Sequence, residues 1–245
     1  MKRIISLKRL AASLAAVQPL LLLLAASLSC HAQPADDMVW PDSLNTAKDA
    51  DYLTEDEKGV IYEMNKVRTN PKLYVEYIKR ERSFYSSNRI ERPGQVAVLT
   101  QEGVAAVDEC IAALQKAQPT GIIRPNKNLG KAAQLLASYQ SKTGKTGHTG
   151  SNGSTISDRI TRYCTEMNDN FGYGYGITFG ENISYGSSKS QGIVVQLLID
   201  DGVPSRGHRA NIMKPDFNAA GVAIDTHPRY RHLCVIDYAF LVYRP

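Results

Sequence analysis

The spacing of apolar residues changes along the chain, and this change limits the folds that the chain can adopt. In the first half, apolar side chains recur every three or four residues, which is the spacing of helices that bury one face. These stripes predict helices near residues 54–67, 71–78, 100–114, 129–140 and 157–162. Thr54 and Glu57 form a capping-box pair, so we expect the folded domain to begin at Thr54. The polar segment 83–96 is predicted to be a loop.

In the second half, the pattern is typical of strands. Residues 179–185 alternate, which places Glu181, Ile183 and Tyr185 on one face of a strand. A buried helix and two further strands are predicted near residues 193–199, 219–225 and 233–242. Helices followed by a few late strands, with no internal repeat, predict an α+β fold.

The first 32 residues have the pattern of a secretory signal peptide. Four basic residues precede an apolar run at 20–26, and small residues follow it. A membrane anchor is the alternative, but Ser13, Gln18 and Pro19 interrupt the apolar stretch and leave it too short to span a bilayer. We therefore expect an exported protein, secreted or periplasmic.

Two cleavage sites compete at the end of this segment. Ala32 suits an ordinary signal peptidase, whereas 27–30 is similar to a bacterial lipobox, which would leave Cys30 lipidated and the protein tethered to a membrane. A lipobox usually has leucine where Ser27 stands, so simple export is favoured.

The segment 33–53 is predicted to be a flexible acidic linker, because it holds five aspartates and few apolar groups. Trp40 is expected to be solvated within it. The whole chain carries +5, but four of its 29 basic residues and none of its 24 acidic residues precede residue 33, which leaves a net charge of +1. Because phosphate backbones are bound by clustered cations, we expect no nucleic-acid partner.

Three cysteines follow the signal segment: Cys110, Cys164 and Cys234. Export permits a disulfide, and an odd number leaves at least one thiol unpaired. Cys110 lies in a helical stripe and is expected to pack as a small apolar residue, so we predict a Cys164–Cys234 bridge. The sequence leaves open that all three are reduced.

Glycine-containing polar segments interrupt the second half of the chain. Their chemically capable side chains are His148, Glu181, either Asp200 or Asp201, and His208. Two imidazoles and two carboxylates in one cavity could hold a divalent metal or act as acid–base pairs. Each residue alone also has an ordinary structural explanation, and their spacing is not a metal signature. Phosphate-binding and serine-nucleophile motifs are absent from the sequence, so no nucleotide cofactor is expected.

The order of four motifs in the sequence resembles the CAP superfamily. They are His148, the Gly-Glu-Asn-Ile run at 180–183, an acidic residue at a helix end and the Gly-His-Arg-Ala-Asn-Ile run at 207–212. This family includes cysteine-rich secretory, antigen 5 and pathogenesis-related 1 proteins and is also called SCP-like. The form of the last run is similar to bacterial members. The resemblance covers residues 54–245 and implies a three-layer α-β-α sandwich.

The resemblance also implies a cavity tetrad of His148, Glu181, Asp201 and His208, in which the two histidines bind a divalent ion, often Zn²⁺. Asn182, Arg209 and Asn211 are expected to support it. Relatives often have glutamate at position 201 and an aromatic pair in place of Leu198 and Ile199, and Asp200 competes for the acidic place.

Three functions fit these residues. We rank first a binding protein for a lipid, sterol or peptide-like extracellular ligand, to which aromatic residues of a loop at 165–178 (Phe171, Tyr173 and Tyr175) would contribute contact area. An interaction-only module ranks second, because a fold does not fix a function. A metal-assisted hydrolase with Glu181 as general base ranks third, since two nitrogen ligands are fewer than a catalytic zinc usually has.

Overall fold

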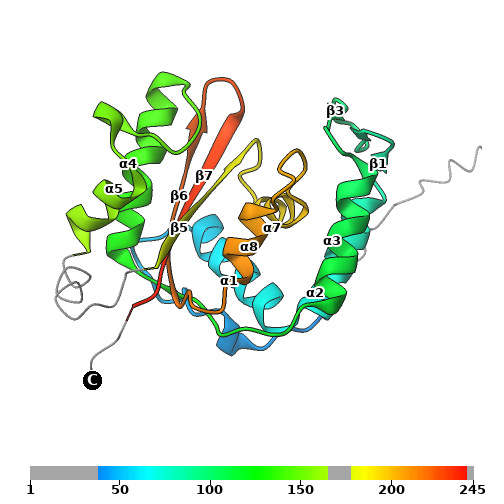
Figure 1. Ribbon diagram of the computed structural model, residues 1–245, viewed down its shortest axis with the longest axis horizontal. Helices are drawn as coiled ribbons and strands as arrows, with labels where there is room; N and C mark the ends of the chain where they lie inside the picture. Colours follow the sequence, from blue (N-terminus) through cyan, green and yellow to red (C-terminus); the bar gives the residue numbers. More distant parts are fainter. Residues whose placement is uncertain (1–37, 165–177, 242–245) are drawn as a thin grey trace, which may run out of the picture. The chain divides into compact units, whose positions relative to one another are not determined.

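Four strands in the second half of the chain join into one sheet in the computed structural model, which describes residues 38–164 and 178–241 (Figure 1). The strand order is β4–β6–β7–β5, and the strands are β4 Arg124–Pro125, β5 Phe179–Tyr185, β6 Ala219–His227 and β7 Arg231–Ala239. β5, β6 and β7 pair antiparallel, and β4 runs parallel to β6. β5 is therefore an edge strand, with the helices close by on both sides.

Helices cover both faces of this sheet. On one face lie α4 Lys127–Thr143 and α5 Ile156–Tyr163, and Leu233 and Val235 of β7 pack against α4. On the other face lie α1 Glu55–Thr69, α7 Ser190–Ile199 and α8 Gly207–Met213, and the Tyr238 hydroxyl donates to the sulfur of Met64 on α1 at 3.2 Å. α2 Pro71–Arg82 and α3 Val104–Lys116 pack on each other and on α7. The predicted α+β three-layer sandwich is confirmed.

The approach of α4 to the sheet depends on Gly221 of β6. A Cβ atom built on Gly221 would lie 2.0 Å from the backbone nitrogen of Gly130 and 2.1 Å from the carbonyl carbon of Leu129. Small residues continue this seam, with Ala132, Ala133 and Ala137 of α4 fully buried. The helix thus packs on the strand backbone itself.

The packed unit begins at Trp40 and not at Thr54, so the predicted linker is wrong from that residue onward. The Trp40 indole is 8% exposed, stacks on Tyr77 and donates its N–H to the Tyr77 hydroxyl at 2.9 Å. A short 3-10 helix, η1 Asp42–Leu44, follows, and Asn65 of α1 donates to the Leu44 carbonyl at 2.9 Å. Few apolar residues suffice here, because Trp40 packs on α2 and Leu44 is buried next to α1.

Arg68 of α1 fixes the chain around α8 from within the core. Its buried guanidinium donates to the carbonyls of Gly121, Ile212, Lys214 and Phe217 at 2.7 to 2.9 Å. Burial lowers the pKa of Arg68 to about 10. These bonds satisfy backbone acceptors that would otherwise be buried without a donor.

Two local predictions differ from the structure between α2 and α3. The predicted loop at 83–96 contains strands of a small sheet, β1 Tyr85–Ser86 and β2 Arg89–Ile90, which continues to β3 Val98–Leu99. The helix predicted from Thr100 begins at Val104. Two-residue strands leave no periodicity that a sequence pattern can reveal.

The predicted Cys164–Cys234 disulfide is not formed, because Cys234 is a free, buried thiol. Cys164 packs with Leu129 and Ala132 of α4 on one face of the sheet. Cys234 lies between Leu233 and Val235, which face α4, so its own side chain points to the opposite face, toward α1. Burial raises the pKa of the Cys234 thiol. Cys110 is buried in α3, as expected.

Several predictions fall outside the described residues: the signal peptide at 1–32, the start of the linker, and the aromatic residues at 171, 173 and 175. None of the helices in the described ranges is long and apolar enough to cross a membrane.

Candidate functional site

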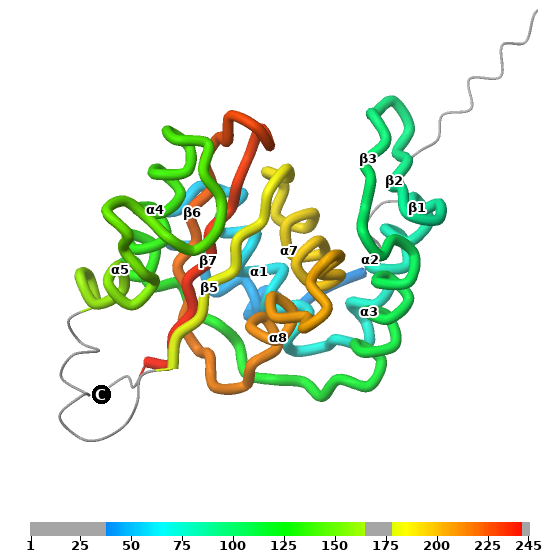
Figure 2. Tube along the Cα trace, turned by 45° about the horizontal axis from the view of Figure 1, so that its top comes forward, coloured from blue at the N-terminus to red at the C-terminus, as the bar shows by residue number. Residues whose placement is uncertain are grey.

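Edge strand β5 carries Glu181, which pairs with His148 of the loop after α4. It runs between α5 on one side and α7 and α8 on the other (Figures 1 and 2). The Nδ1 atom of His148 lies 2.8 Å from Oε1 of Glu181. The His148 side chain is 58% exposed, whereas that of Glu181 is 2% exposed. The imidazole of this pair therefore faces solvent, and the carboxylate that it bonds to is buried.

The loop that carries His148 is fixed by polar contacts with α4 and β5. Gln140 donates from its side-chain nitrogen to the Gly147 carbonyl at 2.5 Å and accepts from the Tyr185 hydroxyl at 2.8 Å. The backbone N–H of Gly147 donates to the same hydroxyl at 3.0 Å. These bonds hold the backbone next to His148, so the imidazole is positioned before any ligand arrives. The Glu181 hydrogen bond raises the pKa of His148.

Glu181 also bonds a buried arginine that the sequence did not identify. Nη2 of Arg159, on α5, donates to Oε2 of Glu181 at 2.6 Å, and Nη1 donates to the Ser154 carbonyl at 2.9 Å and the His148 carbonyl at 3.2 Å. Both oxygens of Glu181 are thus engaged by protein groups. This arrangement suits a carboxylate that orients His148 better than a general base that must reach a water molecule.

Asp237 is a second buried carboxyl group beside Glu181. The two residues are Cα partners in the β5–β7 pair, and Asp237 is 0% exposed. Burial raises its pKa well above the ordinary value, and the charge of Glu181 adds to the shift. Within the described residues no donor reaches either Asp237 oxygen. Asp237 is therefore a buried carboxyl group whose charged form is disfavoured beside Glu181.

Asp237→Asn is expected to raise the stability of the protein increasingly as pH rises from 4 to 8. When the pKa of a carboxyl group is higher in the folded than in the unfolded protein, the free energy of unfolding falls as pH rises above the unfolded pKa, about 3.9 for aspartate. Asparagine keeps the size and shape of the side chain and does not titrate. Urea unfolding of both proteins across this range measures the difference, with Asp216→Asn at an exposed position as control. A difference independent of pH would show that Asp237 ionises normally.

The second histidine pairs with Asp200 and not with Asp201. Nδ1 of His208 lies 2.5 Å from Oδ1 of Asp200, and the backbone N–H of His208 donates to Oδ2 at 2.9 Å. Asp200 ends α7 with a left-handed φ of 58°, a conformation that aspartate tolerates better than most residues. That turn directs its carboxylate toward the start of α8. The predicted tetrad is corrected at this position.

Asp201 bonds to the segment before α3 and not to a histidine. Its carboxylate accepts from the backbone N–H groups of Gln101, Glu102 and Gly103 at 2.7 to 2.8 Å. These N–H groups belong to the turn that leads into α3, which begins at Val104. Asp201 therefore fixes the entry to α3 from a distant segment.

Two of the three predicted supporting residues join the two histidine pairs. Asn182, next to Glu181 on β5, donates to the His208 carbonyl at 2.9 Å. Asn211 donates to the Asn182 side-chain oxygen at 2.9 Å. Arg209 instead binds Glu109 of α3 at 2.5 Å and so ties α8 to that helix. The first pair thus includes Glu181, and the backbone of His208 in the second pair is bonded to the next residue of the same strand, Asn182.

Both imidazoles have the same bonding pattern. Each uses Nδ1 to contact a carboxylate, which favours the tautomer with the proton on Nδ1 and a lone pair on Nε2. This is how metal-binding histidines are usually held. In 38–164 and 178–241, no group of three or more His, Cys, Asp and Glu side chains is placed to hold a metal ion together.

Arg159 and Asp237 were missed for different reasons. Asp237 interrupts an otherwise apolar strand pattern, and a charged residue in such a run is a signal that could have been used. Arg159 lies on a short polar helix where an arginine is ordinary, and nothing in the sequence marks it as buried.

Comparison with known proteins gives one family. The model of the cysteine-rich secretory protein family, CAP, matches residues 62–238. No curated protein matches the chain. Among solved structures, a match is found with an extracellular protein containing a SCP domain from Bacillus anthracis str. Ames, at 15% identity and a TM-score of 0.38, covering 56% of this chain and 37% of that one.

Proposed function

Because the chain belongs to the cysteine-rich secretory protein family, CAP, we propose that it is an exported binding protein whose site is formed by His148 and His208. The two imidazoles hold a divalent cation, Zn²⁺ before Ca²⁺ or Mg²⁺, since nitrogen ligands suit zinc and oxygen ligands suit the others. Water or a ligand completes the coordination.

One observation carries this proposal: both histidines are oriented through Nδ1 by a carboxylate that is itself at most 2% exposed. A carboxylate in this place fixes the ring and increases the basicity of Nε2 toward a metal. The purely structural alternative, an interaction-only module, does not require the same arrangement twice.

Of the three ligand classes implied by the family resemblance, a peptide-like ligand has the best support. The residues that surround the two pairs are charged or carry amides, as with Arg159, Asn182 and Asn211. A sterol or an acyl chain needs apolar walls, whereas the side chains around the two pairs are polar. Arg159 and Asn182 are themselves buried and fix the site from within. Hydrolysis has less support, because Glu181 is fully engaged.

Stoichiometric zinc binding is expected for the wild-type protein, with loss in the His148→Ala/His208→Ala variant. Elemental analysis after mild dialysis and calorimetric titration with zinc, calcium and magnesium measure it. Protons compete for the same Nε2 atoms, so binding should weaken toward acid pH. Absence of zinc binding by the folded wild-type protein would refute the proposal and favour the interaction-only module.

Neighbouring aspartates offer a matched control for the same titration. Asp200→Asn should weaken zinc binding about 10- to 100-fold, which is typical for loss of a carboxylate behind a metal-binding histidine. Asp201→Asn should leave zinc affinity unchanged and lower stability by about 1 kcal/mol, because the amide offers one oxygen in place of two to the three N–H groups that Asp201 binds. Equal zinc affinities in the two variants would contradict the role given to Asp200.

A further inference from the structure

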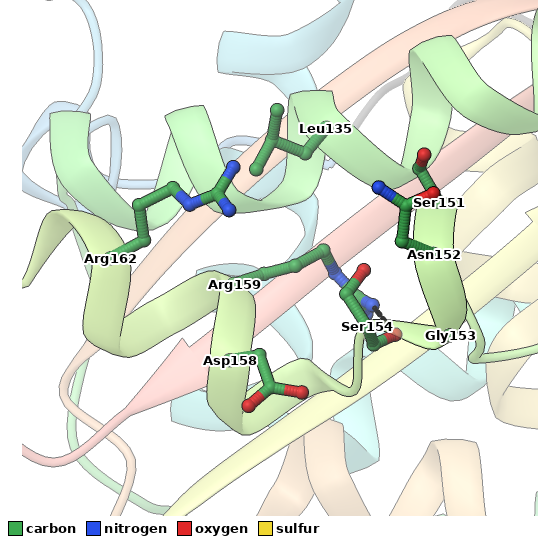
Figure 3. A pocket seen from close by; sticks show the side chains of 8 residues that line it. All are labelled: Leu135, Ser151, Asn152, Gly153, Ser154, Asp158, Arg159 and Arg162. Carbon is green, nitrogen blue, oxygen red and sulfur yellow. Dashed lines mark hydrogen bonds between the residues drawn. The ribbon is translucent and has the colours of Figure 1, made fainter.

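A pocket outside the two histidine pairs lies between α4, α5 and the short 3-10 helix η2 Ser151–Gly153 (Figure 3). Its volume is about 340 Å³. The lining residues are Leu135, Ser151, Asn152, Gly153, Ser154, Asp158, Arg159 and Arg162. This volume is at the lower end of the range for small-molecule sites, about 300–1,000 Å³, so only a small ligand fits.

The charges that line the pocket are positive on balance. Arg159 and Arg162 are opposed by one acid, Asp158, whose Oδ2 already accepts from the backbone N–H and the hydroxyl of Thr155, both at 2.8 Å. Arg162 has no hydrogen bond or ion pair with another residue of the described ranges. Arg159 is already paired with Glu181, which does not line the pocket, so Arg162 supplies the uncompensated positive charge. The single lining carboxylate is committed to capping α5.

Arg159 contributes a buried donor that lacks an acceptor. The residue is 2% exposed; Nη1 and Nη2 are bonded, whereas Nε has no partner among the described residues. Figure 3 shows its side chain between Arg162 and the η2 turn. Leaving such a donor unpaired is costly, and an acceptor supplied by a ligand would remove that cost.

Neutral donors line the rim. The Ser151 hydroxyl and the Asn152 amide are exposed, and Asn152 has a left-handed φ of 53°. Asparagine adopts this conformation more readily than most residues. Arginine, amide and hydroxyl groups together form the usual donor set for an oxyanion.

We propose that this pocket binds a small ligand through a carboxylate or phosphate group, which is held between Arg162 and Arg159. The bound anion lies next to the guanidinium that orients Glu181 and, through it, His148. The pocket is thus a separate anion site that adjoins the histidine site through a single side chain. It does not depend on a metal.

Calorimetric titration of the purified protein with glutarate and with inorganic phosphate tests the site and distinguishes its two sources of oxyanion. Saturable millimolar binding of at least one is expected. Glutaramide, which has the same shape and no charge, should not bind. Arg162→Gln should weaken binding about tenfold, as for loss of one charge-assisted contact, and Arg89→Gln at a distant exposed position should not.

The test separates this site from the histidine site. Anion binding should persist in His148→Ala/His208→Ala, so failure of the zinc proposal leaves it untouched. Absence of saturable binding of both anions, or equal affinities in wild type and Arg162→Gln, would overturn the inference. Binding that disappears only in the histidine double variant would assign the anion to the histidine site instead.

Discussion

Gly221→Ala is expected to destabilise the protein by about 3 kcal/mol or to prevent folding. The new methyl group would lie 2.0 Å from the backbone of Gly130 on α4, and backbone cannot rotate away as a side chain can. α4 must therefore move off the sheet, and such overpacking costs about 1–3 kcal/mol or more. The same shift would displace Gln140, which holds the His148 loop.

Gly130→Ala is the matched control, on the facing side of the same contact. A Cβ atom at Gly130 would meet nothing within 4 Å. Because glycine within a helix is less favourable than alanine by about 0.5–1 kcal/mol, this variant should be slightly more stable than wild type. Urea unfolding followed by circular dichroism measures both. Similar effects of the two substitutions would contradict the one-sided contact.

Arg159→Met is the second substitution with a large expected effect, a loss of about 3–5 kcal/mol. Removing one partner of a buried ion pair leaves the other charge unpaired in a medium of low dielectric constant, and losses of this size are typical. The Glu181 side chain is 2% exposed, and the buried carboxyl group of Asp237 beside it supplies no positive charge. No other cationic side chain of the described residues contacts Glu181, apart from partly exposed His148.

If Arg159→Met destabilises the protein by leaving the Glu181 charge unpaired, the effects of substitutions at the two residues should not be additive. Glu181→Gln should be less harmful in the Arg159→Met background than in wild type, because it then removes an unpaired charge. Arg162→Met, one turn further along α5 and exposed, should change stability by less than about 0.5 kcal/mol. Additive effects of Arg159→Met and Glu181→Gln would show that Arg159 acts by packing alone.

The two variants separate the scaffold from the site. Gly221 supports the histidine loop through the position of α4, whereas Arg159 supports it through Glu181. Residual zinc binding by folded Arg159→Met protein would show how far Glu181 can orient His148 without its arginine.

Local patterns were sufficient for most of the secondary structure. The capping box of Thr54 and Glu57 starts α1, and the alternation at 179–185 gives β5 with its predicted bounds. The signals in these cases lie within a few residues of each other, so neighbours along the chain determine the outcome. α8, by contrast, was read as a polar segment only, since seven residues are too few to show a helical stripe.

Contacts between distant segments decided the rest. Asp200 and Asp201 have the same side chain in adjacent positions, and the left-handed turn at Asp200 directs one carboxylate to His208 and leaves the other for α3. Trp40 is buried because the fold brings Tyr77, which is 37 residues away in the sequence, into contact with it. Cys164 and Cys234 are separated by the thickness of the sheet, which no spacing reveals.

By itself, the sequence determined the α+β class, the family and three of the four residues that pair at the histidine site, since these depend on periodicity and on short motifs. Only the tertiary structure decided which aspartate bonds to His208, that Arg159 and Asp237 are buried beside Glu181, and that Arg159 and Arg162 line one pocket. Burial and charge balance depend on which residues of separate elements meet, and that is a property of the packed fold.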